Sequence, residues 1–248
     1  MPDPAGIGDI GKAMDLAMTA EGTLGAQVLN ELMMVERSRN LFVRNAFVLR
    51  KTLDHLQDPA VWMVPPPPGK TEFEDLDEID RLMHNFLASA YTLATHTMKA
   101  RKVVTGDDFA REYNEHSPWA DPVCKIVEAV RNDVQHAHLA GVESYAIAKL
   151  IPDPGAQPFE FRFRLVRKYL VTLDVNAKTK KYIEELREDP SLDDLIDRYA
   201  SLVVEFVNWF GHAVLEHMAD EVALTTTIRA AAQQIAGPVQ LRIRHFGR

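Results

Sequence analysis

The chain is poor in cysteine and has no long apolar run. Its 248 residues include one cysteine, Cys124, which excludes a disulfide framework and a zinc site built from cysteines. No apolar segment approaches the roughly 20 residues that a membrane-spanning helix needs. The first four residues, Met-Pro-Asp-Pro, lack the basic and apolar regions of a signal peptide. We therefore expect a soluble, cytoplasmic protein with no membrane segment.

An excess of positive charge is also missing. The 28 Lys and Arg residues are outnumbered by 36 Asp and Glu, which gives a formal net charge of −8. This balance argues against a surface that coats nucleic acid broadly, but it is compatible with a narrow cleft lined by a few Arg and His. Apolar residues make up 46% of the chain, enough for a sizeable core, and we therefore expect a folded protein.

Several familiar site motifs are absent. A di-iron site needs Glu-x-x-His pairs on facing helices, and the chain has none. The segment from His212 to His217 has the wrong spacing for a zincin motif. There is no glycine-rich phosphate loop and no nucleophile elbow. The sequence does not exclude a Ser-His-Asp triad whose members come together only in the folded structure. We expect neither a metal nor a cofactor, and Cys124 is interpreted as core filling.

Helical periodicity dominates the sequence and predicts a mainly α-helical single domain over residues 1–248. The first helical region has glycines at 22 and 25 that can break it early, and prolines 65–68 form an extended connector. Residues 237–248 form a basic C-terminal tail, either a strand or an arm. The predicted helices cover residues 10–56, 72–103, 107–115, 121–141, 178–187 and 192–235.

A short region between the helices follows a different pattern. Residues 160–165 alternate between apolar and polar, as a half-buried strand does, and residues 169–175 are a second strand candidate. Residues 145–151 are a candidate partner for them, and the prolines after this segment supply the turn. The pattern predicts a small antiparallel β insert over residues 144–175.

The helix that begins at Asp121-Pro122 carries the most informative residues. Asp at the N-cap and Pro at the first helical position mark its start. Its apolar stripe has the spacing i, i+4, i+7, i+11 and consists of Val123, Val127, Val130 and Val134. At about 100° per residue, Asn132 and His136 fall opposite this stripe and Arg131 lies at its flank. The three polar side chains are therefore candidates for a site open to solvent or to a partner subunit.

A simpler interpretation stays open, because any surface helix has polar residues opposite its apolar stripe. The spacing Arg-x4-His also recurs, from Arg50 to His55 and from Arg111 to His116. On the preceding helix, an uncharged polar stripe is a candidate partner-facing surface or an ordinary exposed one. It consists of Asn85, Ser89, Thr92 and His96.

Arg and His together suit chemistry on a phosphodiester. Histidine moves a proton near neutral pH, and the guanidinium of arginine binds phosphate oxygens in a bidentate manner. RNA carries its own nucleophile, the 2′-OH, and such cleavage needs no metal. Efficient cleavage needs both a general base and a general acid, and a two-fold dimer would bring a second histidine to the site.

The segment from Arg131 to His136 resembles the motif of the HEPN superfamily (higher eukaryote and prokaryote nucleotide-binding). That motif is Arg, a polar residue, and His after four to six intervening residues. Arg131, Asn132 and His136 match it, and His138 also fits the spacing. Residues 86–93 are similar to the long helix before the motif, and the resemblance covers residues 20–140, with a looser match beyond. It implies a HEPN-like antiparallel helical bundle and a homodimer.

The resemblance also implies a function. Many HEPN proteins are metal-independent endoribonucleases that act as toxins or in phage defence, so it implies an RNA substrate and an antitoxin or defence-protein partner. In this interpretation His136 transfers protons, Arg131 holds the scissile phosphate and Asn132 orients either the histidine or the phosphate. The alternative is a non-catalytic HEPN-like dimer that binds a protein or a nucleotide. The intact motif favours the enzyme, whereas the net charge of −8 favours the alternative.

Overall fold

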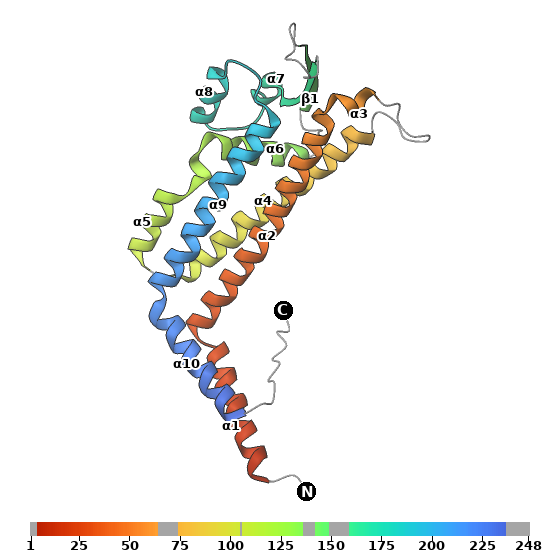
Figure 1. The fold of residues 1–248 in the computed structure, drawn as a ribbon. Helices are drawn as coiled ribbons and strands as arrows, with labels where there is room; N and C mark the ends of the chain where they lie inside the picture. Colours follow the sequence, from red (N-terminus) through yellow and green to blue (C-terminus); the bar gives the residue numbers. More distant parts are fainter. Residues whose placement is uncertain (1–3, 64–73, 105, 136–141, 149–158, 237–248) are drawn as a thin grey trace, which may run out of the picture. The chain divides into compact units, whose positions relative to one another are not determined.

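A computed structural model describes residues 4–63, 74–104, 106–135, 142–148 and 159–236. They are mainly helical with a small antiparallel sheet, as the sequence predicts (Figure 1). The elements in chain order are α1 Pro4–Glu21, α2 Leu24–Gln57, α3 Pro59–Met63, α4 Glu74–Val103, α5 Asp107–His116, a 3-10 helix Pro118–Ala120, α6 Pro122–Gln135, β1 Val142–Ala148, β2 Phe159–Leu165, α7 Arg167–Leu170, α8 Ala177–Glu185, α9 Leu192–His217 and α10 Ala219–Ala236.

Contacts within the chain divide it into two compact units. Unit 1 takes its members from residues 1–35, 96–113 and 209–248, and unit 2 from residues 36–95 and 114–208. Helices α2, α4, α5 and α9 therefore contribute residues to both units. That the whole chain forms one domain stays a prediction, and so does the basic tail at residues 237–248, which lies outside the described residues.

Unit 1 is built around the close packing of α1 against α10 (Figure 1). The buried face of α1 consists of the small residues Ala13, Ala17 and Ala20, which let the two helix backbones approach each other. The Thr23 and Thr225 hydroxyls share a hydrogen bond of 2.6 Å just after α1 ends. The predicted break at Gly22 is confirmed, since α1 ends at Glu21 and α2 begins at Leu24.

Three aromatic rings from different helices form the centre of unit 2. Phe42 on α2 lies 5.5 Å from Phe86 on α4, between ring centroids, and each lies 5.8 Å from Tyr199 on α9. All three side chains are buried. Tilted and edge-on ring pairs at these distances are favourable beyond the apolar area they bury. These contacts hold the unit 2 parts of the three long helices side by side (Figure 1).

The two strands of unit 2 pair in an antiparallel register, with Glu143 opposite Arg164. Phe163 and Leu165 on β2 are fully buried, whereas Arg162 and Arg164 between them stay partly exposed. This alternation is the one that the sequence pattern predicts, and the small antiparallel sheet is confirmed, whereas an insert with bounds 144–175 stays a prediction. At the end of β2, the backbone N–H of Leu165 donates a hydrogen bond of 3.0 Å to the Pro190 carbonyl, which ties the sheet to the segment before α9.

The predicted strand over residues 169–175 is wrong. Residues Arg167–Leu170 form the short helix α7, and hydrogen-bonded turns follow. The buried side chains here are Leu170 and Leu173, whose spacing of three residues fits helical turns rather than a strand. The Asp189 carboxylate accepts a hydrogen bond of 2.8 Å from the Arg167 backbone N–H and so fixes the start of α7. That partner lies 22 residues away, so the local sequence pattern does not reveal it.

The single helix predicted from residue 192 to 235 is interrupted at Met218, between α9 and α10. Met218 is buried, and its backbone hydrogen bonds to Val214 and Val222 bridge the junction at 3.0 Å each. The interruption is thus one residue long. Neither glycine nor proline occurs there, so the sequence carries no signal for it.

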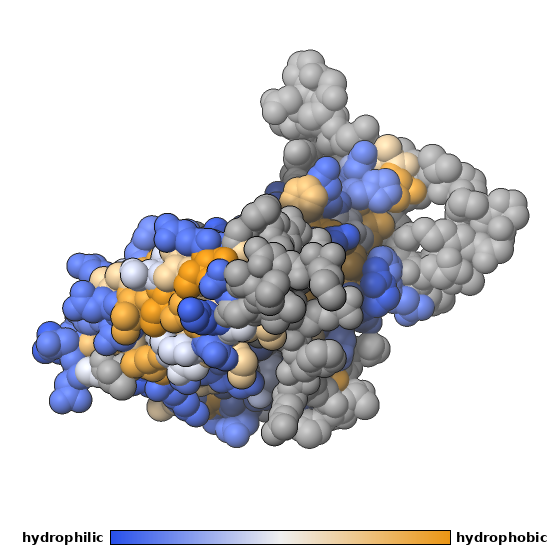
Figure 2. All heavy atoms as spheres, turned by 90° about the horizontal axis from the view of Figure 1, so that it is seen from below, coloured by the Kyte–Doolittle hydropathy of each residue, from blue (hydrophilic) through white to orange (hydrophobic). Residues whose placement is uncertain are grey.

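Large apolar side chains also reach the surface, and Figure 2 shows hydrophobic residues gathered among hydrophilic ones on the face drawn there. On α1 the exposed apolar residues are Ile10, Met14 and Met18, spaced four apart. They form a stripe beside the alanine face that packs on α10. In the part of the chain that the structure describes, no helix is both long enough and apolar enough to cross a membrane.

Candidate functional site

Helix α6 carries two of the predicted site residues and is anchored as the sequence indicates. The Asp121 side chain accepts a hydrogen bond of 2.8 Å from the Val123 backbone N–H, which satisfies one of the free donors of the first turn. Val123, Val127 and Val130 are buried, as predicted, whereas Val134 is only half-buried. The apolar face of α6 is therefore less buried in its last turn, next to the motif residues.

Arg131 is held in a defined position on the flank of α6. Its guanidinium carbon lies 3.6 Å from the centroid of the Tyr91 ring on α4, a cation–π contact. Its Nη1 donates a hydrogen bond of 2.8 Å to Oδ1 of Asn132. Because the Tyr91 ring is 49% exposed, the stacked guanidinium lies at the surface of unit 2. A cation held by an aromatic ring and an amide is preorganised to contact an anion such as a phosphate.

Asn132 is exposed and uses its carbonyl oxygen to fix Arg131. Its amide nitrogen donates to none of the residues that the structure describes. The structure thus brings Arg131 and Asn132 together, and it adds Tyr91, which sequence reasoning missed. Tyr91 belongs to the segment 86–93, and nothing in the local sequence marks it as a partner of Arg131.

The third predicted site residue, His136, lies outside the described residues, as does His138. The position of the histidine relative to Arg131 stays a prediction. Helix α6 is described up to Gln135, the residue before this histidine.

Another contact holds the far side of α6. The Tyr169 hydroxyl on α7 donates a hydrogen bond of 2.8 Å to the Asp133 carboxylate. Burial, and then the hydrogen bond with Asp133, raise the pKa of Tyr169 above its ordinary value. At about 100° per residue, Asp133 points to a side of the helix different from that of Arg131. Helix α6 is therefore anchored on two sides, by Tyr91 through Arg131 and by Tyr169 through Asp133.

The structure separates this arginine from the two that share its spacing to a histidine. Arg50 pairs with Asp54, Asp193 and Asp197 and is committed to joining α2 to α9 within unit 2. Arg111 forms an i, i+3 ion pair of 3.0 Å with Asp108 on its own helix. Arg131 has no carboxylate partner among the described residues.

The uncharged stripe on α4 is less available to a partner than its sequence suggests. Ser89 is buried and donates to the Phe86 carbonyl at 2.9 Å. The Thr92 hydroxyl donates to the Ala88 carbonyl at 2.9 Å, and the Asn45 side chain on α2 donates a hydrogen bond of 3.1 Å to the backbone carbonyl of Asn85. The hydroxyl groups of Ser89 and Thr92 are thus satisfied within their own helix, and the buried Ser89 contradicts a continuous partner-facing stripe.

Cys124 lies on the buried face of α6. Burial, more than any other influence, raises the pKa of its thiol to about 12. A thiol is a nucleophile only as the thiolate, so this cysteine fills the core. Among the residues that the structure describes, no group of three or more His, Cys, Asp or Glu side chains could hold a metal ion.

Comparisons with known proteins add no relative. No protein-family model matches the chain, and neither a curated protein nor a solved structure shows significant similarity to it. The HEPN resemblance therefore rests on the residues of the sequence motif alone and stays a prediction.

Proposed function

We propose that this chain is a HEPN-type endoribonuclease that cleaves RNA without a metal, acting as a toxin or phage-defence effector. One observation supports the proposal above the others. The Arg131 guanidinium is held at the surface by the Tyr91 ring and Asn132, and no carboxylate among the described residues neutralises it. An arginine placed in this way is suited to hold a phosphate.

In the proposed reaction the 2′-OH of one nucleotide attacks the adjacent phosphorus. His136 takes the proton of that hydroxyl, and Arg131 stabilises the negative charge that develops on the phosphate oxygens. The bond from phosphorus to the 5′-oxygen breaks, and this oxygen receives a proton from an acid. The products are a 2′,3′-cyclic phosphate and a free 5′-hydroxyl. Asn132 acts as a positioning residue through its hydrogen bond with Arg131.

The acid in this scheme is His136 of a second copy of the chain. A two-fold dimer places the same residues on both sides of its axis, which supplies a base and an acid from one sequence position. The dimer is measured by light scattering. A monomer at high micromolar concentration would contradict this part of the proposal.

Arg131 offers a direct test of its role in cleavage. Arg131→Lys keeps the positive charge but loses the bidentate fork, and we expect cleavage to fall by about 100-fold or more. Tyr91→Phe keeps the ring and should retain activity, whereas Tyr91→Leu removes the cation–π contact and should reduce it by roughly threefold. Arg111→Lys is the matched control, because Arg111 has the same spacing to a histidine but pairs with Asp108. Equal activity of Arg131→Lys and Arg111→Lys would contradict the proposed role.

A binding protein without catalysis is the second candidate, and the net charge of −8 favours it. The two functions differ in a gel assay with single-stranded RNA in EDTA. The enzyme cleaves the RNA into shorter fragments. A binding protein produces no fragments, whether or not it slows the migration of the RNA in the gel. Absence of cleavage across RNAs of diverse sequence would favour the binding function.

A further inference from the structure

The exposed face of α2 in unit 2 carries a row of cations, here called the basic row. It consists of Arg37, Arg44 and Lys51, which follow one another at seven-residue spacing and are all exposed. Because seven residues make about two helical turns, the three side chains lie along one line of about 21 Å. Residues 36–51 contain five Arg or Lys and one Glu, a formal charge of +4 in a chain whose net charge is −8.

The cations of the basic row are not neutralised by the chain itself. None of them forms an ion pair with any residue that the structure describes. The acidic residues nearest to them in sequence have other partners, since Glu36 pairs with Arg39 at 3.1 Å and Asp54 pairs with Arg50. Three unpaired cations on one line create a local positive potential, which favours an anionic partner.

Apolar side chains border the basic row on both sides. Leu41 and Val48 lie along one edge and are 49% and 37% exposed. Phe47 and Val43 lie along the other edge and are 59% and 42% exposed. At about 100° per residue, these two pairs of positions fall on either side of the row. The ammonium of Lys51 lies 5.3 Å from the centroid of the Phe47 ring. The face therefore consists of a line of positive charge between two apolar edges.

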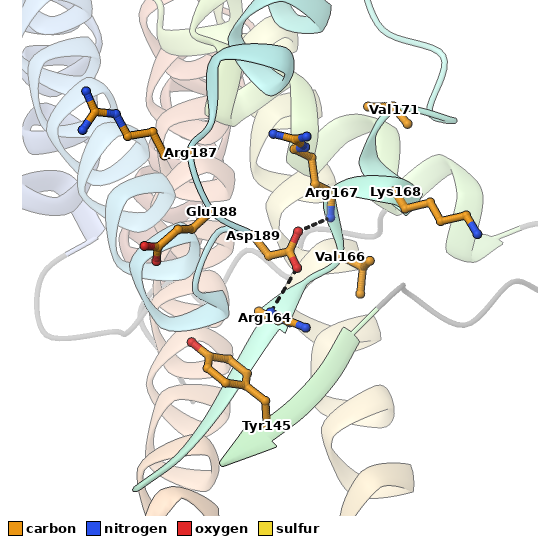
Figure 3. A pocket seen from close by; sticks show the side chains of 9 residues that line it. All are labelled: Tyr145, Arg164, Val166, Arg167, Lys168, Val171, Arg187, Glu188 and Asp189. Carbon is orange, nitrogen blue, oxygen red and sulfur yellow. Dashed lines mark hydrogen bonds and ion pairs between the residues drawn. The ribbon is translucent and has the colours of Figure 1, made fainter. Parts of the chain in front are cut away.

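A second group of basic residues in unit 2 is arranged differently. Four Arg or Lys and two Asp or Glu line a pocket of about 670 Å³. Its walls come from the two-stranded sheet, from α7 and from the segment that follows α8 (Figure 3). Arg164 there pairs with Asp189 at 3.2 Å. Figure 3 shows Arg187 and Lys168 extending away from each other. This basic pocket therefore presents no aligned set of cations, unlike α2.

The order of charged and apolar side chains on α2 indicates which anionic partner fits. A helix that lies on a membrane buries one continuous apolar face and keeps its cations outside it. On α2 the cations run between the apolar edges, so lipid that covered the edges would also bury the charges. A nucleic-acid backbone supplies anions but little for the apolar edges to pack against. A second copy, packed by two-fold symmetry about Arg44, would place Arg37 against Lys51, and like charges repel.

We propose that this face of α2 binds an amphipathic helix of another protein, in which a row of Asp or Glu runs between two apolar edges. Such a helix has the same period as α2, so acidic side chains at seven-residue spacing meet the basic row along its whole length. The apolar edges of the partner cover Leu41, Val48 and Phe47 and exclude water from the ion pairs. The proposal is independent of the ribonuclease function.

Fluorescence anisotropy with labelled synthetic helices tests the proposal on the full chain. The first peptide has a row of Glu, at the spacing of the basic row, between two edges of Leu. The second peptide has Lys in place of every Glu, and the third has Gln in place of every Leu. We expect the wild type to bind the first peptide, and to bind each of the other two about tenfold more weakly or less.

A charge reversal on α2 should exchange the preferred peptide. The double variant Arg37→Glu/Arg44→Glu should bind the first peptide about tenfold more weakly than the wild type does, and should bind the second peptide more tightly. Both side chains are exposed and unpaired among the described residues, so the variant should fold. The matched control Lys178→Glu/Lys180→Glu makes the same change in net charge on the exposed surface of α8 and should bind like the wild type.

Several results would overturn the proposal. The first is no binding of the Glu and Leu peptide at millimolar concentration, and the second is equal binding of that peptide by the wild type and the α2 double variant. Equal affinity of the wild type for all three peptides would show that neither the basic row nor its apolar edges select the partner. Phosphatidylserine vesicles or a single-stranded RNA that bind the wild type but not the α2 double variant, with no binding of the peptides, would assign the face to lipid or to RNA.

Discussion

Replacing Gly25 with alanine should destabilise unit 1, where the start of α2 meets α10. A Cβ at this position would lie 2.6 Å from the carbonyl carbon of Glu221 and still closer to its oxygen and to Oγ1 of Thr225. Real Cβ atoms essentially never approach other atoms so closely. Thr225 is fully buried, and its hydroxyl bonds to the Glu221 carbonyl and to Thr23. Neither neighbour can move without breaking these contacts.

The magnitude follows from two opposing effects. Forcing an extra methyl group into close packing costs about 1–3 kcal/mol, and loss of the buried threonine hydrogen bond adds about 1 kcal/mol. The gain in helix propensity on going from glycine to alanine is at most about 1 kcal/mol, and less in a first turn. We therefore expect the free energy of unfolding to fall by about 2 kcal/mol.

Urea denaturation followed by circular dichroism measures the change. Gly211→Ala is the matched control, because a Cβ there meets nothing within 4 Å and Gly211 lies inside α9. That variant should gain about 0.5–1 kcal/mol. Gly25→Ala that is as stable as the wild type, or an equal loss in both variants, would refute the packing argument.

The remaining predictions concern buried groups of unit 2. Val130→Ala should lower the free energy of unfolding by about 1–3 kcal/mol in urea denaturation, because Val130 is buried on α6; no loss would show that α6 packs loosely. Cys124 should resist thiol reagents at pH 8 in the native protein and react only after unfolding, since burial raises its pKa to about 12; rapid native labelling would contradict this. Burial also raises the pKa of Asp193 despite the Gln57 hydrogen bond and the Arg50 charge. The folded state therefore binds this proton more tightly than the unfolded chain does, and the stability that it contributes falls as pH rises from the unfolded pKa, about 4, through the folded pKa. Asp193→Asn should be at least as stable as the wild type at pH 7 and should lack this slope just above pH 4; a large loss at pH 7 would show that the Arg50 ion pair dominates.

Much of the helical framework follows from local patterns. The valine stripe of α6, its Asp121 cap and the break at Gly22 depend on residues close in sequence, and all appear in the structure. The alternation of β2 likewise reflects one buried face. Such features are readable because period and capping chemistry act within a few residues.

The features that the sequence did not reveal depend on distant partners. Residues 169–175 have strand-like composition, but the Asp189 carboxylate and the burial of Leu170 and Leu173 favour helical turns. The cation–π contact between Arg131 and Tyr91 joins two helices, so no single periodicity predicts it. The basic pocket gathers three separate segments, and its charge is hidden in the acidic total.

In the proposed reaction the RNA supplies the nucleophile and the residues around Arg131 hold the phosphate. The direct test compares the cleavage of two single-stranded RNAs in EDTA. The first is an RNA whose cleavage position has been mapped, and the second is the same RNA with a single 2′-deoxynucleotide at that position. We predict that the wild type cuts the first RNA to a 2′,3′-cyclic phosphate, that the deoxy substitution stops cleavage there, and that His136→Ala cuts neither. Cleavage of the deoxy-substituted RNA at the same bond, or unchanged cleavage by His136→Ala, would contradict the account.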